Sequence, residues 1–257
     1  KLSVRSFKVI IDGSLGSHGA CLIQPYSDSA TYGIMLQEPA EVQEIFKLAK
    51  SIGYQVNSHC IGDSANRVVL STIDTLMTDV ADHRWRIEHA QVIHPNDFDL
   101  FESSRALPSV QPTHATSDQR WAEKHLGEQR LEQGAYAYRS LHERSGMIIF
   151  GTDFPVEHFD PFATLYAATK RKDVANEPNE GFLLDENVSL PTALKAMTLW
   201  AAFGCFEEAN SGTLEKGKDA TLTIIDQPIE QKDKFLPNYA NLTIVNGQPV
   251  YDMNLRW

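Results

Sequence analysis

Two histidines and one aspartate stand where apolar, strand-like runs of the sequence end. His59 ends YQVNSH, His89 lies at the end of WRIEHA, and Asp153 follows MIIF by three residues. Imidazole nitrogens and carboxylate oxygens suit zinc or another borderline divalent ion. If the carboxyl ends of these strands converge, as in an α/β barrel, the three side chains can meet at one metal site.

Each of these residues also has a purely structural interpretation. A histidine at a strand end is often a hydrogen-bonded structural residue, and an aspartate in a turn often caps the next segment. Lys8 could be an exposed strand residue, but its apolar neighbours in FKVII favour a position that faces the same cavity. His114 follows the fourth strand and could face that cavity too, whereas His94 is placed at the entry of a helix.

Apolar runs alternate with stretches of helical periodicity over the first 205 residues. This alternation predicts a parallel sheet built from right-handed βαβ units. After about residue 205 the sequence changes to short β-rich segments divided by turn residues, which indicates a small β domain. We expect strands at 7–11, 54–59, 85–90, 106–112 and 147–150, and helices at 38–52, 62–80, 95–104, 116–126, 134–145, 161–171 and 189–203.

Composition narrows the classes of partner. The chain has 257 residues, of which 42% are apolar and 22% charged, as in ordinary globular proteins. A net charge of −11 argues against nucleic acid and against an anionic membrane surface as partners. Three separated cysteines form no disulfide framework, and the first residues lack the features of a signal peptide. A cytoplasmic location is therefore expected.

Six motifs in a fixed order carry a family resemblance. They are KVIIDGSLGS, SHCIGDSANR, RIEHAQ, SVQPTH, GTDFPVE and GTLEKGKDATLTIID. Together they resemble the C-terminal half of the amidohydrolase superfamily, in the family 3 group that includes N-substituted formamide deformylase and exoenzyme regulatory proteins. The resemblance implies an α/β fold: strands four to eight of a partial (β/α)8 TIM-type barrel at 1–205, and the C-terminal part of a small β-sandwich at 206–257.

The resemblance also implies roles for individual residues. His59, His89 and Asp153 would bind a divalent metal, with zinc favoured and one or two ions in the intact enzyme. Asp153 would also shuttle the catalytic proton. Lys8 would be carboxylated and bridge two ions. Gln111, His114 and Arg139 are candidates for substrate contact, on position alone. The activity implied is hydrolysis of an amide or other C–N bond in a small molecule, by an activated water that attacks the carbonyl carbon.

One expected motif is missing from these residues. The superfamily takes two metal ligands from an HxH motif on strand one, and no two of the nine histidines here are spaced in that way. We therefore expect a fragment that forms a homo-oligomer or associates with a missing N-terminal half. The alternative is a catalytically silent binding or regulatory protein of the same fold. A dinucleotide-binding protein fits poorly, because DGSLGS is not GxGxxG.

Overall fold

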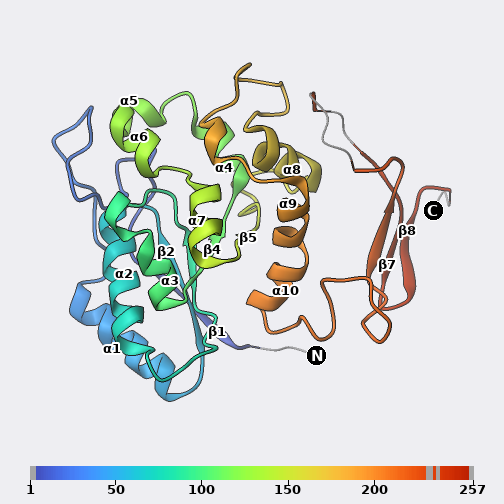
Figure 1. The fold of residues 1–257 in the computed structure, drawn as a ribbon, viewed down its shortest axis with the longest axis horizontal. Coiled ribbons are helices and arrows are strands. Elements are labelled where there is room, and N and C mark those ends of the chain that lie inside the picture. Colours follow the sequence, from blue (N-terminus) through green and yellow to red (C-terminus); the bar gives the residue numbers. More distant parts are fainter. Residues whose placement is uncertain (1–3, 230–233, 236–237, 255–257) are drawn as a thin grey trace.

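The protein contains one parallel and one antiparallel sheet (Figure 1). A computed structural model describes residues 4–229, 234–235 and 238–254. The parallel sheet has the order β1-β2-β3-β4-β5, so each strand pairs with the next one along the chain. This confirms the predicted mixed α/β fold with a parallel sheet. Its strands are β1 (Ser6–Ile10), β2 (Gln55–Cys60), β3 (Arg86–His89), β4 (Leu107–Val110) and β5 (Ile149–Phe150).

Helices connect these strands and cover the sheet. In one group each helix packs against the next along the chain, and the group contacts β2 and β4. Its members are α1 (Pro39–Ser51), α2 (Asp63–Leu76), α3 (Asp99–Ser104) and α7 (Tyr138–Ser145). A second group packs around β5, namely α4 (Pro112–Asp118), α8 (Pro161–Lys170), α9 (Leu190–Met197) and α10 (Leu199–Gly204). The remaining helical segments are η1 (Pro95–Asp97), α5 (Ala122–Leu126), α6 (Glu128–Gly134) and η2 (Leu184–Glu186).

The helical periods predicted from the sequence place the core. In α1, Val42, Phe46 and Ala49 recur at helical spacing and are all buried. Phe46 packs edge-on against Trp85 at the start of β3, with 5.1 Å between ring centroids. Val9 of β1 is buried on the same side of the sheet, so this core lies between the sheet and the first group of helices.

The other face of the parallel sheet is polar. Across β1, β2 and β3 the register aligns Lys8 with Asn57 and Arg86. Side chains of paired residues in neighbouring strands point to the same face, and residues two apart in a strand share it. Ile10 pairs with His59, and Lys8 lies two residues before Ile10 in β1. Lys8 and His59 therefore lie on the same face of the sheet.

Several predicted helix boundaries were wrong. The stretch 116–126 is covered by α4 and α5, with the first of them beginning already at Pro112. The stretch 134–145 holds α7 and the last residue of α6, Gly134, because Tyr136 between them adopts a left-handed backbone with φ 50°. Helix α2 ends at Leu76 instead of continuing to residue 80, and its N-cap is Gly62. The Asp63 carboxylate accepts the Ile23 N–H.

The C-terminal segment forms the antiparallel sheet, which Figure 1 shows to one side of the α/β part. Its strands are β6 (Leu222–Ile225), β7 (Ala240–Val245) and β8 (Gln248–Asp252). Asn246 and Gly247 both have positive φ, as the tight turn of a two-residue β-hairpin demands. A domain division at 205/206 stays a prediction. Among the described residues, no helix is both long and apolar enough to cross a bilayer.

Candidate functional site

Three imidazoles form a row at the carboxyl ends of β2, β3 and β4. The rings of His59 and His89 meet edge to face, with 4.4 Å between their centroids. His114, in the first turns of α4, stacks near His89 at 5.9 Å. The structure thus brings together three histidines that the sequence placed after three successive strands.

Hydrogen bonding leaves ring nitrogens of this row available. The Nδ1 atom of His89 lies 2.8 Å from the Gln111 amide oxygen, while the Gln111 amide nitrogen faces the Ser109 carbonyl. Because an amide oxygen only accepts, His89 Nδ1 carries the proton and its Nε2 keeps a free lone pair. The Nε2 atoms of His59 and His114 are buried without a hydrogen-bond partner. Such orphaned nitrogens fit a divalent cation.

Burial keeps these rings in the form that binds metal. It lowers the pKa of His59 to about 4, helped by the nearby charges of His89 and Lys8 and opposed by Asp153. It also lowers the pKa of His89 to about 4, against the hydrogen bond to Gln111. Both imidazoles are therefore neutral near pH 7, and a neutral ring nitrogen is the metal ligand.

Asp153 and Lys8 lie near the row without joining it directly. Asp153 is exposed in the turn after β5, and its charge raises the pKa of both His59 and His114. Its φ of 54° and the φ of 76° at His89 are unusual for residues other than glycine. Strained backbone of this kind is concentrated at functional sites. Lys8 is exposed on β1, and its charge lowers the pKa of both His59 and His89.

Arg139 lies apart from the three imidazoles. Its Nε is 2.9 Å from Glu143 Oε1 one turn further along α7, and its side chain is 57% exposed. The other charges that raise its pKa are Glu186 and Asp185, which belong to η2. A role for Arg139 in substrate contact stays a prediction, and no contact described for it points toward the row.

Asp12 is a buried aspartate next to His59 that the sequence analysis did not identify. Asp12 accepts backbone N–H groups of Cys21, Ile61 and Gly62 at 2.9, 3.0 and 2.7 Å. Its Oδ1 lies 3.8 Å from His59 Nε2. Burial raises the pKa of Asp12 to about 7 although the three backbone N–H groups oppose this. A carboxylate directly after the apolar run FKVII was the signal that could have revealed it.

A second acidic group lies beyond His114. Asp118, the last residue of α4, accepts the Tyr136 hydroxyl at 2.8 Å and the Gln91 amide at 3.3 Å. Gln91 also donates to the Tyr136 oxygen at 2.9 Å, so the three side chains form a closed network. Burial raises the pKa of Asp118 to about 6. Nothing local in the sequence marks this network.

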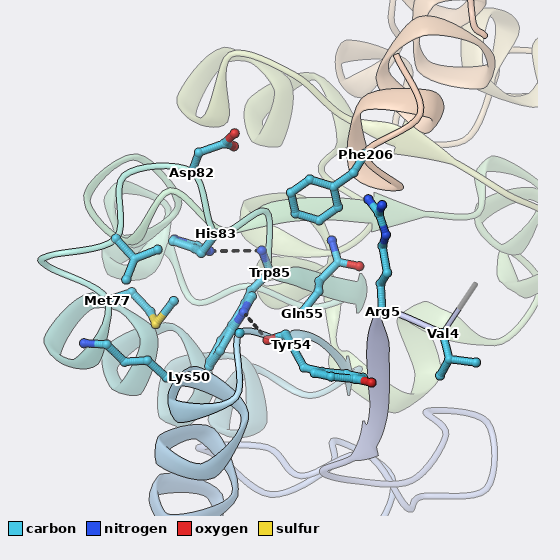
Figure 2. Close-up of a pocket in the computed structure, with 12 residues that line it drawn as sticks. Val4, Arg5, Lys50, Tyr54, Gln55, Met77, Asp82, His83, Trp85 and Phe206 are labelled. Carbon is cyan, nitrogen blue, oxygen red and sulfur yellow. Dashed lines mark hydrogen bonds between the residues drawn. The ribbon is translucent and has the colours of Figure 1, made fainter. Parts of the chain in front are cut away.

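The cavity drawn in Figure 2 is not this site. It encloses about 360 Å³ among the residues that precede β1, β2 and β3, including Arg5, Tyr54 and Trp85. Figure 2 shows Trp85 donating its indole N–H to the Tyr54 carbonyl, at 3.2 Å. These positions are at the amino ends of the strands, opposite to His59 and His89. In parallel-strand barrels the chemistry belongs to the carboxyl ends, so we place the site at the histidine row.

Comparison with known proteins identifies the family. Residues 1–251 match the family model described as "Amidohydrolase family", and the chain belongs to that family. It is 31% identical over 248 residues to "Protein LONG AFTER FAR-RED 3" of Arabidopsis thaliana and 29% identical over 258 residues to "Putative amidohydrolase YtcJ" of Bacillus subtilis. An uncharacterized metal-dependent hydrolase from Pyrococcus furiosus has a similar structure, with a TM-score of 0.70 and 31% identity over 83% of this chain.

The matched relatives are much longer than this chain. The alignments take in 95% and 96% of the chain but 42% of the Arabidopsis protein and 47% of the Bacillus protein. The chain also covers 42% of the Pyrococcus structure. It thus spans somewhat less than half the length of the proteins it matches.

Proposed function

We propose that this chain supplies the C-terminal half of a metal-dependent hydrolase site, at which His59 and His89 hold a divalent ion. The observation that carries the proposal is the pair of available nitrogens: His59 Nε2 is buried and unpartnered, and the Gln111 hydrogen bond leaves His89 Nε2 free. The similarity to a metal-dependent hydrolase and to a protein named an amidohydrolase supports it. Zinc is the ion we favour, because it accepts imidazole nitrogen and carboxylate oxygen together.

In the proposed reaction an amide or other C–N bond of a small molecule is hydrolysed. A bound zinc ion would polarise the carbonyl group and lower the pKa of water towards about 7. Asp153 would accept the proton of the attacking water on its carboxylate and return it to the leaving nitrogen. The Gln111 amide keeps the His89 ring in the tautomer described above, and His114 lies beside it for contact with the substrate.

Lys8 enters the proposal as a second source of oxygen ligands. Its ammonium group would have to lose one proton, attack carbon dioxide through Nζ and release a second proton from Nζ, which gives a carbamate with two oxygens. Burial beside apolar groups favours the neutral amine. Since Lys8 is exposed on β1 here, carboxylation requires another segment to cover this edge.

The edge of β1 offers a place for that segment. Among the described residues β1 pairs with β2 alone, and Phe7 and Ile10 are about half exposed. Together with Ile45 and Leu48 of α1 they line an apolar groove beside Lys8. Unpaired strand groups and exposed apolar side chains favour association. We propose that the five strands are strands four to eight of a TIM-type barrel, and that a parallel strand of an N-terminal half docks here.

Zinc content tests the site. Purified protein saturated with zinc is compared with a His59→Gln/His89→Gln variant and with His94→Asn as the matched control, since His94 lies outside the row as the cap of η1. The double variant should lose about one zinc ion per chain, and the control should lose none. Equal zinc content in all three proteins would refute the site.

A catalytically silent binding or regulatory protein is the second candidate. The sequence permits it, because no two of the nine histidines form an HxH pair. Assays of N-formyl and N-acyl amines, with zinc and with a separately expressed family half that carries HxH, separate the two candidates. Turnover that depends on Asp153 would support the hydrolase, and zinc binding without turnover would support the silent protein.

A further inference from the structure

A second group of metal-ligating side chains lies away from the histidine row. His18 Nε2 is 2.9 Å from Asp28 Oδ1, and His125 Nδ1 is 2.8 Å from Asp28 Oδ2. The rings of His18 and His125 lie 4.2 Å apart, and one ligating atom from each of the three residues falls within 4.8 Å of the others. Among the described residues, these three are the group of histidine, cysteine, aspartate or glutamate side chains whose ligating atoms all lie within 4.8 Å of one another.

Solvent reaches little of the trio, and the Lys124 ammonium also lies 3.9 Å from Asp28 Oδ2. The side chains of Asp28 and His125 are 15% and 10% exposed, and that of His18 is 31% exposed. Burial raises the pKa of Asp28, but the hydrogen bonds of His18 and His125 outweigh it and leave that pKa below its ordinary value. The carboxylate is therefore ionised at neutral pH and held between two imidazoles.

We propose that His18, Asp28 and His125 form a second cation site that takes zinc or another borderline divalent ion. Two nitrogens and one oxygen are the ligand set such ions prefer. In the hydrogen-bonded trio His18 Nε2 and His125 Nδ1 face a carboxylate that only accepts, so both nitrogens carry protons, which a bound ion would displace. Two ligand atoms on a tetrahedral zinc ion at 2.0–2.2 Å stand about 3.3 Å apart. The two histidine–aspartate separations of 2.9 and 2.8 Å need to widen by about half an ångström, and the His18–His125 separation, which is within 4.8 Å, has to reach the same value. Small side-chain rotations would supply these changes.

The trio joins two loops of the protein, so a bound ion would have a structural role. His18 and Asp28 belong to the loop after β1, and His125 belongs to α5, which follows β4. Two further hydrogen bonds join the same segments: Ser27 N–H donates to the His125 carbonyl at 2.8 Å, and Arg130 donates to the Gln24 carbonyl at 3.1 Å. Both segments leave the carboxyl ends of their strands. A bound ion would therefore hold together two loops that leave the carboxyl ends of β1 and β4.

Cobalt provides a direct test, because Co²⁺ in a tetrahedral site of this kind absorbs visible light. The His59→Gln/His89→Gln variant is stripped with chelator and titrated with Co²⁺ and with Zn²⁺. We expect it to bind about one ion per chain and to melt at a higher temperature with zinc than without. Adding His18→Gln and His125→Gln should abolish both effects, while His94→Asn in the same background should leave them intact.

The outcomes separate this site from the histidine row. A folded His59→Gln/His89→Gln protein that binds no ion would overturn the second site while leaving the first untouched. Binding that persists after His18→Gln and His125→Gln would overturn it as well. Asp28→Asn in the otherwise unaltered protein covers the case in which the double variants fail to fold: its zinc content should fall by about one ion per chain, and an unchanged content would refute the proposal.

Discussion

Asp118 offers a quantitative test of how burial sets charge near the histidine row. Its carboxylate is held by Tyr136 and Gln91, and burial raises its pKa from 3.8 to about 6. One pKa unit corresponds to about 1.4 kcal/mol, so a shift of about two units corresponds to about 3 kcal/mol. An Asp118→Asn variant keeps the shape and an acceptor oxygen but cannot ionise.

The sign of the effect follows from proton binding. The folded protein holds the Asp118 proton more tightly than the unfolded chain does, so this group stabilises the fold fully below pH 3.8. That stabilisation is lost as the pH rises through about 6, where the buried carboxyl must ionise. The variant escapes this loss. Its free energy of unfolding minus that of the wild type should therefore rise by about 2.4 kcal/mol between pH 4 and pH 7.5, because about 0.6 kcal/mol of the full change has already occurred at pH 4.

Urea unfolding at the two pH values measures this difference. Asp99→Asn is the matched control, because Asp99 is also a helical aspartate but its side chain is 75% exposed in an ion pair with Arg144. The control difference should change by less than about 1 kcal/mol, as is usual for exposed pairs. An Asp118→Asn difference that is equally flat would show that Asp118 ionises as an exposed carboxyl does, and that its burial is not the dominant influence.

Asp12→Ala should lower the free energy of unfolding in urea titrations by about 3 kcal/mol or more, because three buried N–H groups lose their acceptor; a loss below about 1 kcal/mol would contradict that role. Gln111→Ala should weaken zinc binding about tenfold in calorimetric titrations, because His89 loses the partner that orients its ring; unchanged affinity would argue against this support. Leu48→Glu should reduce self-association of the chain in sedimentation velocity, because it places a charge in the apolar groove beside β1. Unchanged self-association would show that this groove is not the interface.

The sequence was informative where the signal is local. The five strands and α1 were predicted within about two residues of their bounds at most ends, because apolar runs and helical spacing arise from neighbours in the chain. His59, His89 and His114 met because parallel strands in consecutive order bring equivalent positions together. Strand-end placement was therefore enough to predict a cluster.

The sequence was uninformative where contacts between distant segments determine the local structure. The predicted helix over 134–145 fails at its start because Gly134 is the last residue of α6 and Tyr136 has a φ of 50°, so α7 begins only at Tyr138. Gly134 packs against the Ile93 carbonyl, where a Cβ would lie 1.8 Å from the oxygen. Asp28 and His125 are 97 positions apart, and no periodicity connects them. Pairing of that kind depends on how loops fold over the rim, which single-sequence patterns do not encode.

Consecutive strand order has a consequence for how the chain folds. Ser6 pairs with Gln55 and Asn57 with Arg86, so each strand pair closes a single crossover and can condense soon after its own segment is available. The contact between Asp28 and His125 encloses roughly twice the length of the first crossover, at an added closure cost of about 0.6 kcal/mol. We expect the sheet to assemble progressively from neighbouring βα units, and the rim loops to join only after β4 is in place.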